Sequence, residues 1–163
     1  MCKRVLIPGS YDPVTLGHTA LIAHAAARYD EVWVVAFVNA AKDYLFTVEE
    51  RLSFLRHACA RFPRVKVAFD GGYVADFVKA HGIELLLKGY RNPADLAYEQ
   101  EMAAYNLAHS GVETRLVPCA PELCHVSASE VRRRLYAGES PAGLLPDEVV
   151  DEVRAAFAAH QKT

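Results

Sequence analysis

Hydroxyl, imidazole and amide groups gather in one short stretch, residues 9–18, which reads Gly-Ser-Tyr-Asp-Pro-Val-Thr-Leu-Gly-His. Ser10 supplies a hydroxyl beside a glycine-permitted turn, and His18 falls in the first turn of the helix expected next. Free backbone amides and partial positive charge at a helix start favour a phosphate, to which a histidine adds a donor. The stretch fits neither a Walker A loop nor a G-x-G-x-x-G fingerprint, which disfavours a P-loop NTPase or an ordinary NAD enzyme. The alternative is a plain strand–helix turn whose histidine is exposed by chance.

Three cations follow other predicted strands. Lys42 lies in the loop after the second strand, and Lys88 and Arg91 follow the fourth. An ammonium acts as a point charge toward phosphates, whereas a guanidinium offers a planar, two-pronged donor. A solvated loop lysine is the alternative for Lys42, but its place on the expected ligand edge of a sheet favours a function.

A serine-rich stretch begins one of the last two predicted helices. Ser127 and Glu130 have the spacing of a capping box, and the free amides of that helix start could hold a phosphate. The arginines at 132–134 form in part a solvated face. One of them can face a phosphate, and the sequence does not tell which.

Short β-rich apolar runs alternate with longer helical patterns, as they do in a doubly wound α/β fold. The expected fold is therefore α/β with a five-stranded parallel sheet, and ligands of such sheets bind outside the carboxyl ends of the strands. The expected strands are residues 4–8, 31–38, 65–69, 84–87 and 113–117, and the expected helices are residues 17–28, 47–59, 74–80, 93–108, 127–136 and 147–160.

Length and composition restrict the class of protein. The chain has 163 residues, of which 52% are hydrophobic and 23% charged, and its mean hydropathy is +0.04. These values predict a single domain over residues 1–163 and exclude a disordered chain. The formal net charge of -2 gives no basic field for nucleic acid or a membrane surface. The longest strongly apolar run, residues 32–38, is far too short to span a bilayer, and a cytoplasmic protein is expected.

The four cysteines, Cys2, Cys59, Cys119 and Cys124, are expected to be reduced thiols, because no secretion signal marks the chain for an oxidising compartment. Cys119, Cys124 and His125 lie close together in the sequence. Their spacing is not that of a zinc knuckle and no second ligand pair appears, so structural thiols are favoured over a zinc site.

The residues before His18 also match a known signature. Thr15-Leu16-Gly17-His18 resembles the (T/H)-x-G-H motif of the nucleotidyltransferase α/β superfamily. Further blocks in family order narrow the resemblance to the bacterial phosphopantetheine adenylyltransferases. They are Gly-Ser-Tyr-Asp-Pro at 9–13, Lys42, Phe-Thr-Val-Glu-Glu-Arg at 46–51, Lys-Gly-Tyr-Arg at 88–91, Asp-Leu-Ala-Tyr-Glu at 95–99 and Val-Ser-Ala-Ser at 126–129.

This resemblance implies a Rossmann-like nucleotidyltransferase fold and the transfer of AMP from ATP to 4'-phosphopantetheine, giving dephospho-coenzyme A and pyrophosphate in coenzyme A biosynthesis. It implies Mg2+ carried by the ATP phosphates, with no metal ligands from the protein, and a homohexamer. Two alternatives stay open. One is another small-molecule nucleotidyltransferase that uses nicotinamide mononucleotide or a glycerol or sugar phosphate as acceptor. The other is a non-catalytic module that senses ATP or coenzyme A.

The resemblance also implies roles for individual residues. The catalytic residues would be His18, Lys42 and Arg91, with His18 stabilising the transition state of an in-line attack. The phosphopantetheine would contact Ser10, Lys42, Val74 and Lys88, and Tyr73 adjoins this set. Lysine at 88 departs from the family's usual arginine, which keeps the charge and loses the two-pronged donor. The ATP-binding set would be Ser10, Tyr11, His18, Gly89, Tyr90, Arg91, Glu99, Leu123, Cys124, His125, Val126, Ser127, Ala128 and Ser129.

Overall fold

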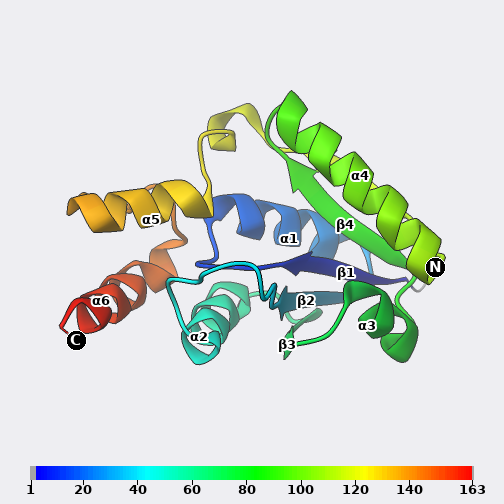
Figure 1. Cartoon of the computed structure of the whole chain (residues 1–163), viewed down its shortest axis with the longest axis horizontal. Coiled ribbons are helices and arrows are strands. Elements are labelled where there is room, and N and C mark those ends of the chain that lie inside the picture. The colour runs from blue at the N-terminus through cyan, green and yellow to red at the C-terminus, as the bar shows by residue number, and fades with distance from the viewer. Residues whose placement is uncertain (1–2, 163) are drawn as a thin grey trace.

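The computed structural model describes residues 3–162, which alternate between strands and helices for most of their length (Figure 1). No helix in this part of the chain is both long enough and apolar enough to cross a membrane. The strands are β1 Arg4–Gly9, β2 Glu31–Phe37, β3 Val65–Asp70, β4 Leu85–Tyr90 and β5 Thr114–Pro118. The helices are α1 Leu16–Arg28, α2 Val48–Cys59, α3 Val74–His81, α4 Pro93–Ser110, α5 Ala128–Ala137 and α6 Val150–Gln161, with 3-10 turns at Pro121–Leu123 and Asp147–Val149.

The five strands form one sheet in the order β3-β2-β1-β4-β5, and all neighbouring pairs are parallel. The predicted doubly wound sheet is thus confirmed. The chain moves outward from β1 to β3 and then returns to the other side of β1 with β4. The topological switch point therefore lies between β1 and β4, and a ligand of this fold binds at their carboxyl ends.

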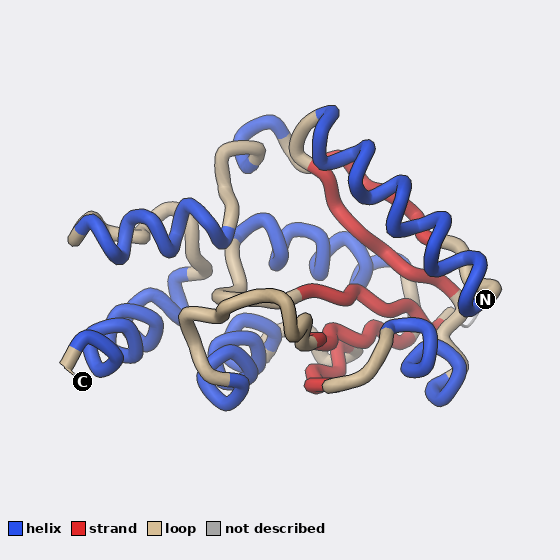
Figure 2. The backbone as a smooth tube through the Cα atoms, viewed as in Figure 1, coloured by secondary structure: helices blue, strands red, loops and turns tan. Residues whose placement is uncertain are grey.

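Each face of the sheet is covered by helices (Figure 2). Val5 and Ile7 of β1 pack into one cluster with Ile22 of α1 and Phe54 of α2. Leu6, which points to the opposite face, packs with residues of α3 and β4 in a second cluster. Alternate residues of β1 thus serve two cores, as expected for a strand covered on both sides. Helices α5 and α6 extend beyond the carboxyl ends of the strands (Figure 1).

Local signals explain why the helices begin where they do. The predicted capping box at α2 is present, because the Thr47 hydroxyl accepts from the Glu50 amide and the Glu50 carboxylate accepts from the Thr47 amide. At α5 only half of the predicted box forms. Ser127 caps the Glu130 amide at 3.0 Å, while the Glu130 carboxylate is taken by Arg133. The last helix also begins later than predicted, because residues 147–149 form a 3-10 turn.

The expectation of reduced thiols is wrong for one pair, since Cys119 and Cys124 form a disulfide. The 3-10 turn Pro121–Leu123 folds the chain back between them, so that their Cα atoms lie 5.9 Å apart, within the range that a disulfide spans. Cys59 is a free, buried cysteine. Cys2 lies outside the described residues.

Candidate active site

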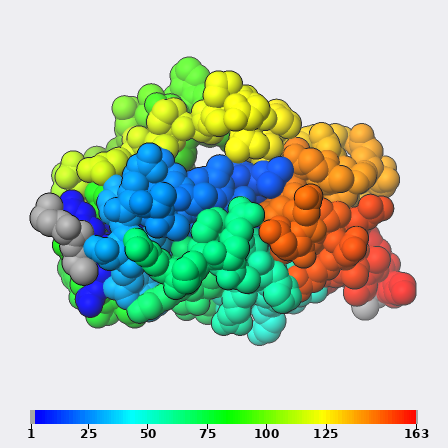
Figure 3. Space-filling model, turned by 180° about the vertical axis from the view of Figure 1, so that it is seen from behind, coloured from blue at the N-terminus to red at the C-terminus, as the bar shows by residue number. Residues whose placement is uncertain are grey.

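Three loops meet at the carboxyl ends of β1 and β4, next to the start of α1 and opposite the start of α5. The loop after β1 carries Ser10 and Thr15, the loop after β2 carries Lys42, and the end of β4 leads into Arg91. Seen from behind, the space-filling surface has an opening between the yellow segment near residue 120 and the blue start of α1 (Figure 3). The site is thus a gap that is crossed on one side by the segment joining β5 to α5.

His18 is oriented by the residue that caps its own helix. The Thr15 amide donates to Nδ1 of His18 at 2.9 Å, and the Thr15 hydroxyl accepts from the His18 amide at 3.4 Å. The ring also meets Tyr11 edge-on, with centroids 4.7 Å apart. Nδ1 is therefore an acceptor, which leaves the proton of the neutral ring on Nε2. The spacing of Thr15 and His18 was visible in the sequence, but the capping role of Thr15 was not predicted.

The charge state of His18 follows from its surroundings. Burial, together with the nearby charges of Lys88 and Arg91, lowers the pKa of His18 to about 4. At neutral pH the ring is uncharged and its Nε2–H is a neutral hydrogen-bond donor. Since both cations act on the ring, the structure also brings together His18, Lys88 and Arg91, three residues predicted for one site.

Ser10 and Lys42 meet although 32 residues separate them. The Lys42 ammonium donates to the Ser10 hydroxyl at 3.3 Å, and Lys42 is exposed while Ser10 is half-buried. The lysine of the β2 loop therefore lies against the hydroxyl of the β1 loop.

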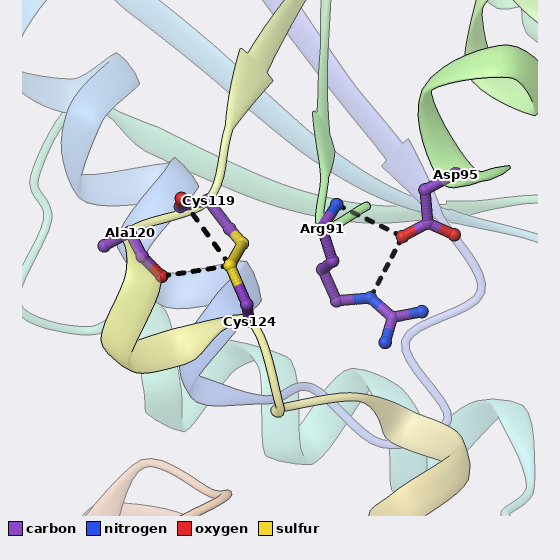
Figure 4. Close-up of a disulfide and its surroundings, with 5 residues drawn as sticks. All are labelled: Arg91, Asp95, Cys119, Ala120 and Cys124. Carbon is purple, nitrogen blue, oxygen red and sulfur yellow. Dashed lines mark hydrogen bonds and ion pairs between the residues drawn. A yellow bond between two sulfur atoms is a disulfide. The ribbon is translucent and has the colours of Figure 1, made fainter. Parts of the chain in front are cut away.

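On the other side of the switch point, Lys88 joins three elements. Its ammonium lies 3.4 Å from the Glu99 carboxylate of α4 and donates to the Pro8 carbonyl of β1 at 3.4 Å. Arg91 is held in turn by Asp95, which accepts from its backbone amide at 3.2 Å and from its Nε at 3.1 Å (Figure 4). The two cations thus have carboxylate partners that keep them beside the gap.

Two residues that the sequence analysis left without a role hold the loops together. Arg51 of α2 is buried and donates from Nη1 to the Ser10 carbonyl at 2.9 Å, and its guanidinium lies 4.2 Å from the centroid of the Tyr44 ring. The buried carboxylate of Asp12 accepts from the amides of residues 45 and 46 at 2.9 and 3.0 Å. Both belong to sequence blocks that carried the family resemblance, which was the available signal.

The structure also distinguishes among the three arginines of α5. Arg132 donates to the Asp12 carbonyl at 2.8 Å and to the Ser129 hydroxyl at 3.1 Å, so it faces the β1 loop. Arg133 and Arg134 instead pair with Glu130 on the helix surface. The basic run is therefore partly a solvated face, as predicted, and Arg132 is its inward member.

Several predicted ligand residues have side chains with other partners. Tyr11 is buried with a positive φ of 50°, its hydroxyl donates to the Ile7 carbonyl at 2.8 Å, and burial strongly raises its pKa. Val126 is buried in the main core cluster, and Leu123 packs against that cluster. For these three residues the backbone is what a nucleotide could contact.

Five further residues, Tyr73, Val74, Gly89, Tyr90 and His125, are not brought to the Ser10–His18 loop by any described contact. Val74 begins α3 and packs on the second core cluster, and Tyr73 before it is largely exposed. Both follow β3, which lies at the edge of the sheet, two strands from β1. Gly89 and Tyr90 end β4, and His125 is exposed just before the α5 cap.

Comparisons with known proteins agree with this geometry. Residues 6–134 match the family model described as cytidylyltransferase-like. The chain is 41% identical over 159 residues to the phosphopantetheine adenylyltransferase of Symbiobacterium thermophilum, covering 97% of this chain and 98% of that protein. It is 39% identical over 149 residues to the phosphopantetheine adenylyltransferase of Streptomyces coelicolor, covering 91% of this chain and 94% of that protein.

The parallel sheet, the helix start at the switch point and the matched family model define a nucleotidyltransferase of the cytidylyltransferase-like class. The likeness to the two bacterial enzymes extends over almost the whole chain at about 40% identity. Within that class, the chain belongs to the phosphopantetheine adenylyltransferase family.

Proposed function

We propose that this protein transfers the adenylyl group of ATP to 4'-phosphopantetheine, giving dephospho-coenzyme A and pyrophosphate. The observation that carries the proposal is the bond from the Thr15 amide to Nδ1 of His18, which presents Nε2–H as a fixed donor beside Lys88 and Arg91. Family membership supplies the substrate class. The same relatives favour this acceptor over nicotinamide mononucleotide or glycerol phosphate, and favour an enzyme over a silent sensor.

The chemistry needs positioning and charge stabilisation more than covalent help. The phosphate of 4'-phosphopantetheine is itself the nucleophile and attacks the α-phosphorus in line with the departing pyrophosphate. His18 donates from Nε2 to an α-phosphate oxygen as negative charge concentrates there, and the ring remains neutral throughout. Because the donor is already oriented, little reorganisation is required when the charge develops.

The cations bring the two anionic substrates together. Lys42 and Ser10 hold the acceptor phosphate, since the Lys42 ammonium already contacts the Ser10 hydroxyl in the loop after β1. Lys88 binds the same phosphate from the β4 side, and Val74 contacts the pantetheine arm. Arg91 takes an ATP phosphate, after exchanging part of its contact with Asp95 for the nucleotide. The nucleotide contacts residues 10–11, 89–91, 99 and 123–129, and at Tyr11, Leu123 and Val126 it contacts the backbone.

We propose that Mg2+ binds together with ATP. Among residues 3–162 there is no group of three or more His, Cys, Asp or Glu side chains placed to hold a metal ion. The residues around the gap include cations, hydroxyls and amides, which suit phosphate oxygens, and the carboxylates of Glu99 and Asp95 pair with two of those cations. We assign the ion to the phosphates of ATP and to water, where it would supply charge neutralisation for the phosphate oxygens.

We also propose a homohexamer that works in the cytoplasm. Helix α4 supports assembly, because none of its 18 residues is buried and it exposes Tyr98, Met102 and Tyr105. Contiguous exposed apolar surface of this kind is typical of a protein interface. Light scattering after gel filtration tests the assembly, and a monomer at micromolar concentration would contradict it.

An isotope experiment tests the direction of attack. 4'-Phosphopantetheine labelled with 18O in its phosphate is incubated with ATP, Mg2+ and the enzyme, and the products are analysed by mass spectrometry. In-line attack by the acceptor phosphate requires all of the label in dephospho-coenzyme A and none in pyrophosphate. Label in pyrophosphate, or an adenylylated protein, would contradict the mechanism.

A further inference from the structure

The disulfide Cys119–Cys124 lies at the rim of the proposed nucleotide site (Figure 4). The Cys119 amide donates to the Tyr90 carbonyl at 2.9 Å, so one end of the disulfide is joined to the strand that leads into Arg91. Cys124 lies three residues before Ser127, the cap of α5. The ring that the disulfide closes therefore connects the two parts of the chain that flank the gap.

This ring lies in the segment that joins β5 to α5. Residues 119–126 cross from β5 to α5 beside the opening seen in the space-filling view (Figure 3). Their order comes from one 3-10 turn, in which the Leu123 amide donates to the Ala120 carbonyl at 2.8 Å, and from the packing of Leu123 and Val126 on the main core cluster. A covalent link across so short a segment removes conformational freedom that the turn alone does not.

The residues around the two cysteines are compatible with both the disulfide and the reduced dithiol. Both cysteines are partly exposed, so a small thiol or the tip of a reductase can reach them. The carbonyl oxygens of Ala120 and Cys119 lie 3.5 and 3.9 Å from Sγ of Cys124. In the reduced protein these two carbonyls can accept the Cys124 S–H, which therefore has a partner without a rearrangement of the turn.

We propose that Cys119 and Cys124 form a thiol–disulfide exchange site whose redox state sets the affinity of the enzyme for ATP. A dithiol reductant attacks one of the two sulfurs as a thiolate and forms a mixed disulfide, and its second thiol then displaces the protein sulfur. Two electrons and two protons pass to the protein, which becomes a dithiol, and the reductant becomes a disulfide. Among enzymes that work surrounded by reducing thiols, such pairs commonly serve redox sensing.

The consequence for the site follows from what the segment carries. Reduction removes the covalent restraint on residues 119–124, and the backbone of this turn, which would contact the nucleotide, loses order before binding. We expect the KM for ATP to rise severalfold in the reduced form. The KM for 4'-phosphopantetheine should change little, because Ser10 and Lys42 lie on other loops. This kinetic part depends on the proposed function, whereas the exchange itself does not.

Thiol labelling of the whole protein tests the exchange directly. The protein is equilibrated in a series of glutathione buffers from oxidising to reducing and is then quenched with N-ethylmaleimide under denaturing conditions. Mass spectrometry counts the labels on the intact protein and maps the labelled peptides. The account expects Cys119 and Cys124 to gain label together as the buffer becomes reducing. Cys59, which is buried and free, is the internal control and takes label in every buffer. Equal labelling of the pair in all buffers would overturn the proposal.

Steady-state kinetics and ATP calorimetry on the two forms test the coupling. The variant Cys119→Ser/Cys124→Ser should match the reduced wild type in its Kd and KM for ATP and should not respond to the buffer. Cys59→Ser is the matched control and should keep the response. An unchanged Kd for ATP between the two forms would overturn the coupling. Absence of turnover in both forms would instead overturn the proposed function, while labelling and calorimetry would still decide the exchange site.

Discussion

The Thr15 amide donates to Nδ1 of His18 at 2.9 Å, and this one bond determines which nitrogen of the ring carries the proton. Because Thr15 also caps α1, the helix start and the tautomer of His18 are set by the same residue. A capping box usually places a carboxylate or an amide at the third helical position. Here the imidazole of His18 takes that position, so the capping box also orients the Nε2–H donor of the ring.

NMR of the imidazole nitrogens tests this arrangement. His18 should show the Nε2–H tautomer at pH 7 and titrate near pH 4, because burial and the charges of Lys88 and Arg91 disfavour the imidazolium. Above about pH 5 the ring should remain neutral. The unfolded chain binds this proton at its usual pKa of 6.5, so His18 makes the folded state less stable as pH falls from 6.5 toward 4. His18→Gln assigns the signal, and a ring that titrates near 6.5 would contradict the account.

Removal of the His18 ring should affect the rate more than binding. His18→Ala should lower kcat by roughly a hundredfold or more, because a donor to the transition-state oxygen is lost. The Kd for ATP, measured by calorimetry, should change far less. Weakened binding at an unchanged kcat would show that the ring serves the ground state instead.

Arg51 should act on the acceptor through Ser10. Arg51→Met removes the bond to the Ser10 carbonyl and should raise the KM for 4'-phosphopantetheine more than the KM for ATP. It should also lower the melting temperature, because the half-buried Ser10 carbonyl and the Tyr44 ring lose a partner. Arg56→Met, on the exposed face of the same helix, is the matched control and should change neither KM. A purely structural role would lower the melting temperature of Arg51→Met and leave the ratio of the two KM values unchanged.

The substitution Lys88→Arg, which introduces the arginine usual in the family, should be tolerated. Lys88→Arg keeps the charge beside Glu99 and adds a two-pronged donor, so activity should persist with an equal or lower KM for 4'-phosphopantetheine. Initial rates at varied acceptor concentration measure this. A severe loss of activity would mean that the contact of Lys88 with the Pro8 carbonyl requires an ammonium.

Local patterns in the sequence predicted most of the fold. The Thr47–Glu50 capping box lies within four residues, and the strands follow from apolar runs, so neither depends on distant contacts. The boundaries that were missed, such as the 3-10 turn before α6, depend on packing rather than on propensity. The Cys119–Cys124 disulfide differs from the expectation for another reason: the lack of a secretion signal favours reduced thiols, whereas the 3-10 turn that brings the two cysteines together is seen only in the folded chain.

The sequence predicted which residues belong to the candidate site but not which of them contact one another. Ser10 and Lys42 were both predicted, yet only the folded chain shows that they touch across 32 residues. The bond of Asp12 to the Phe46 amide spans 34 residues, and that of Arg132 to the Asp12 carbonyl spans 120. Such contacts depend on the sheet order, which a single sequence does not reveal residue by residue.

Pyrophosphate release from ATP and Mg2+ with different acceptors tests the central claim most directly. The acceptors are 4'-phosphopantetheine, nicotinamide mononucleotide and buffer alone, with CTP and glycerol 3-phosphate as a fourth condition. The account predicts release with 4'-phosphopantetheine alone, and loss of that release in His18→Ala. Release with another acceptor, or none in any condition while ATP still binds, would contradict it.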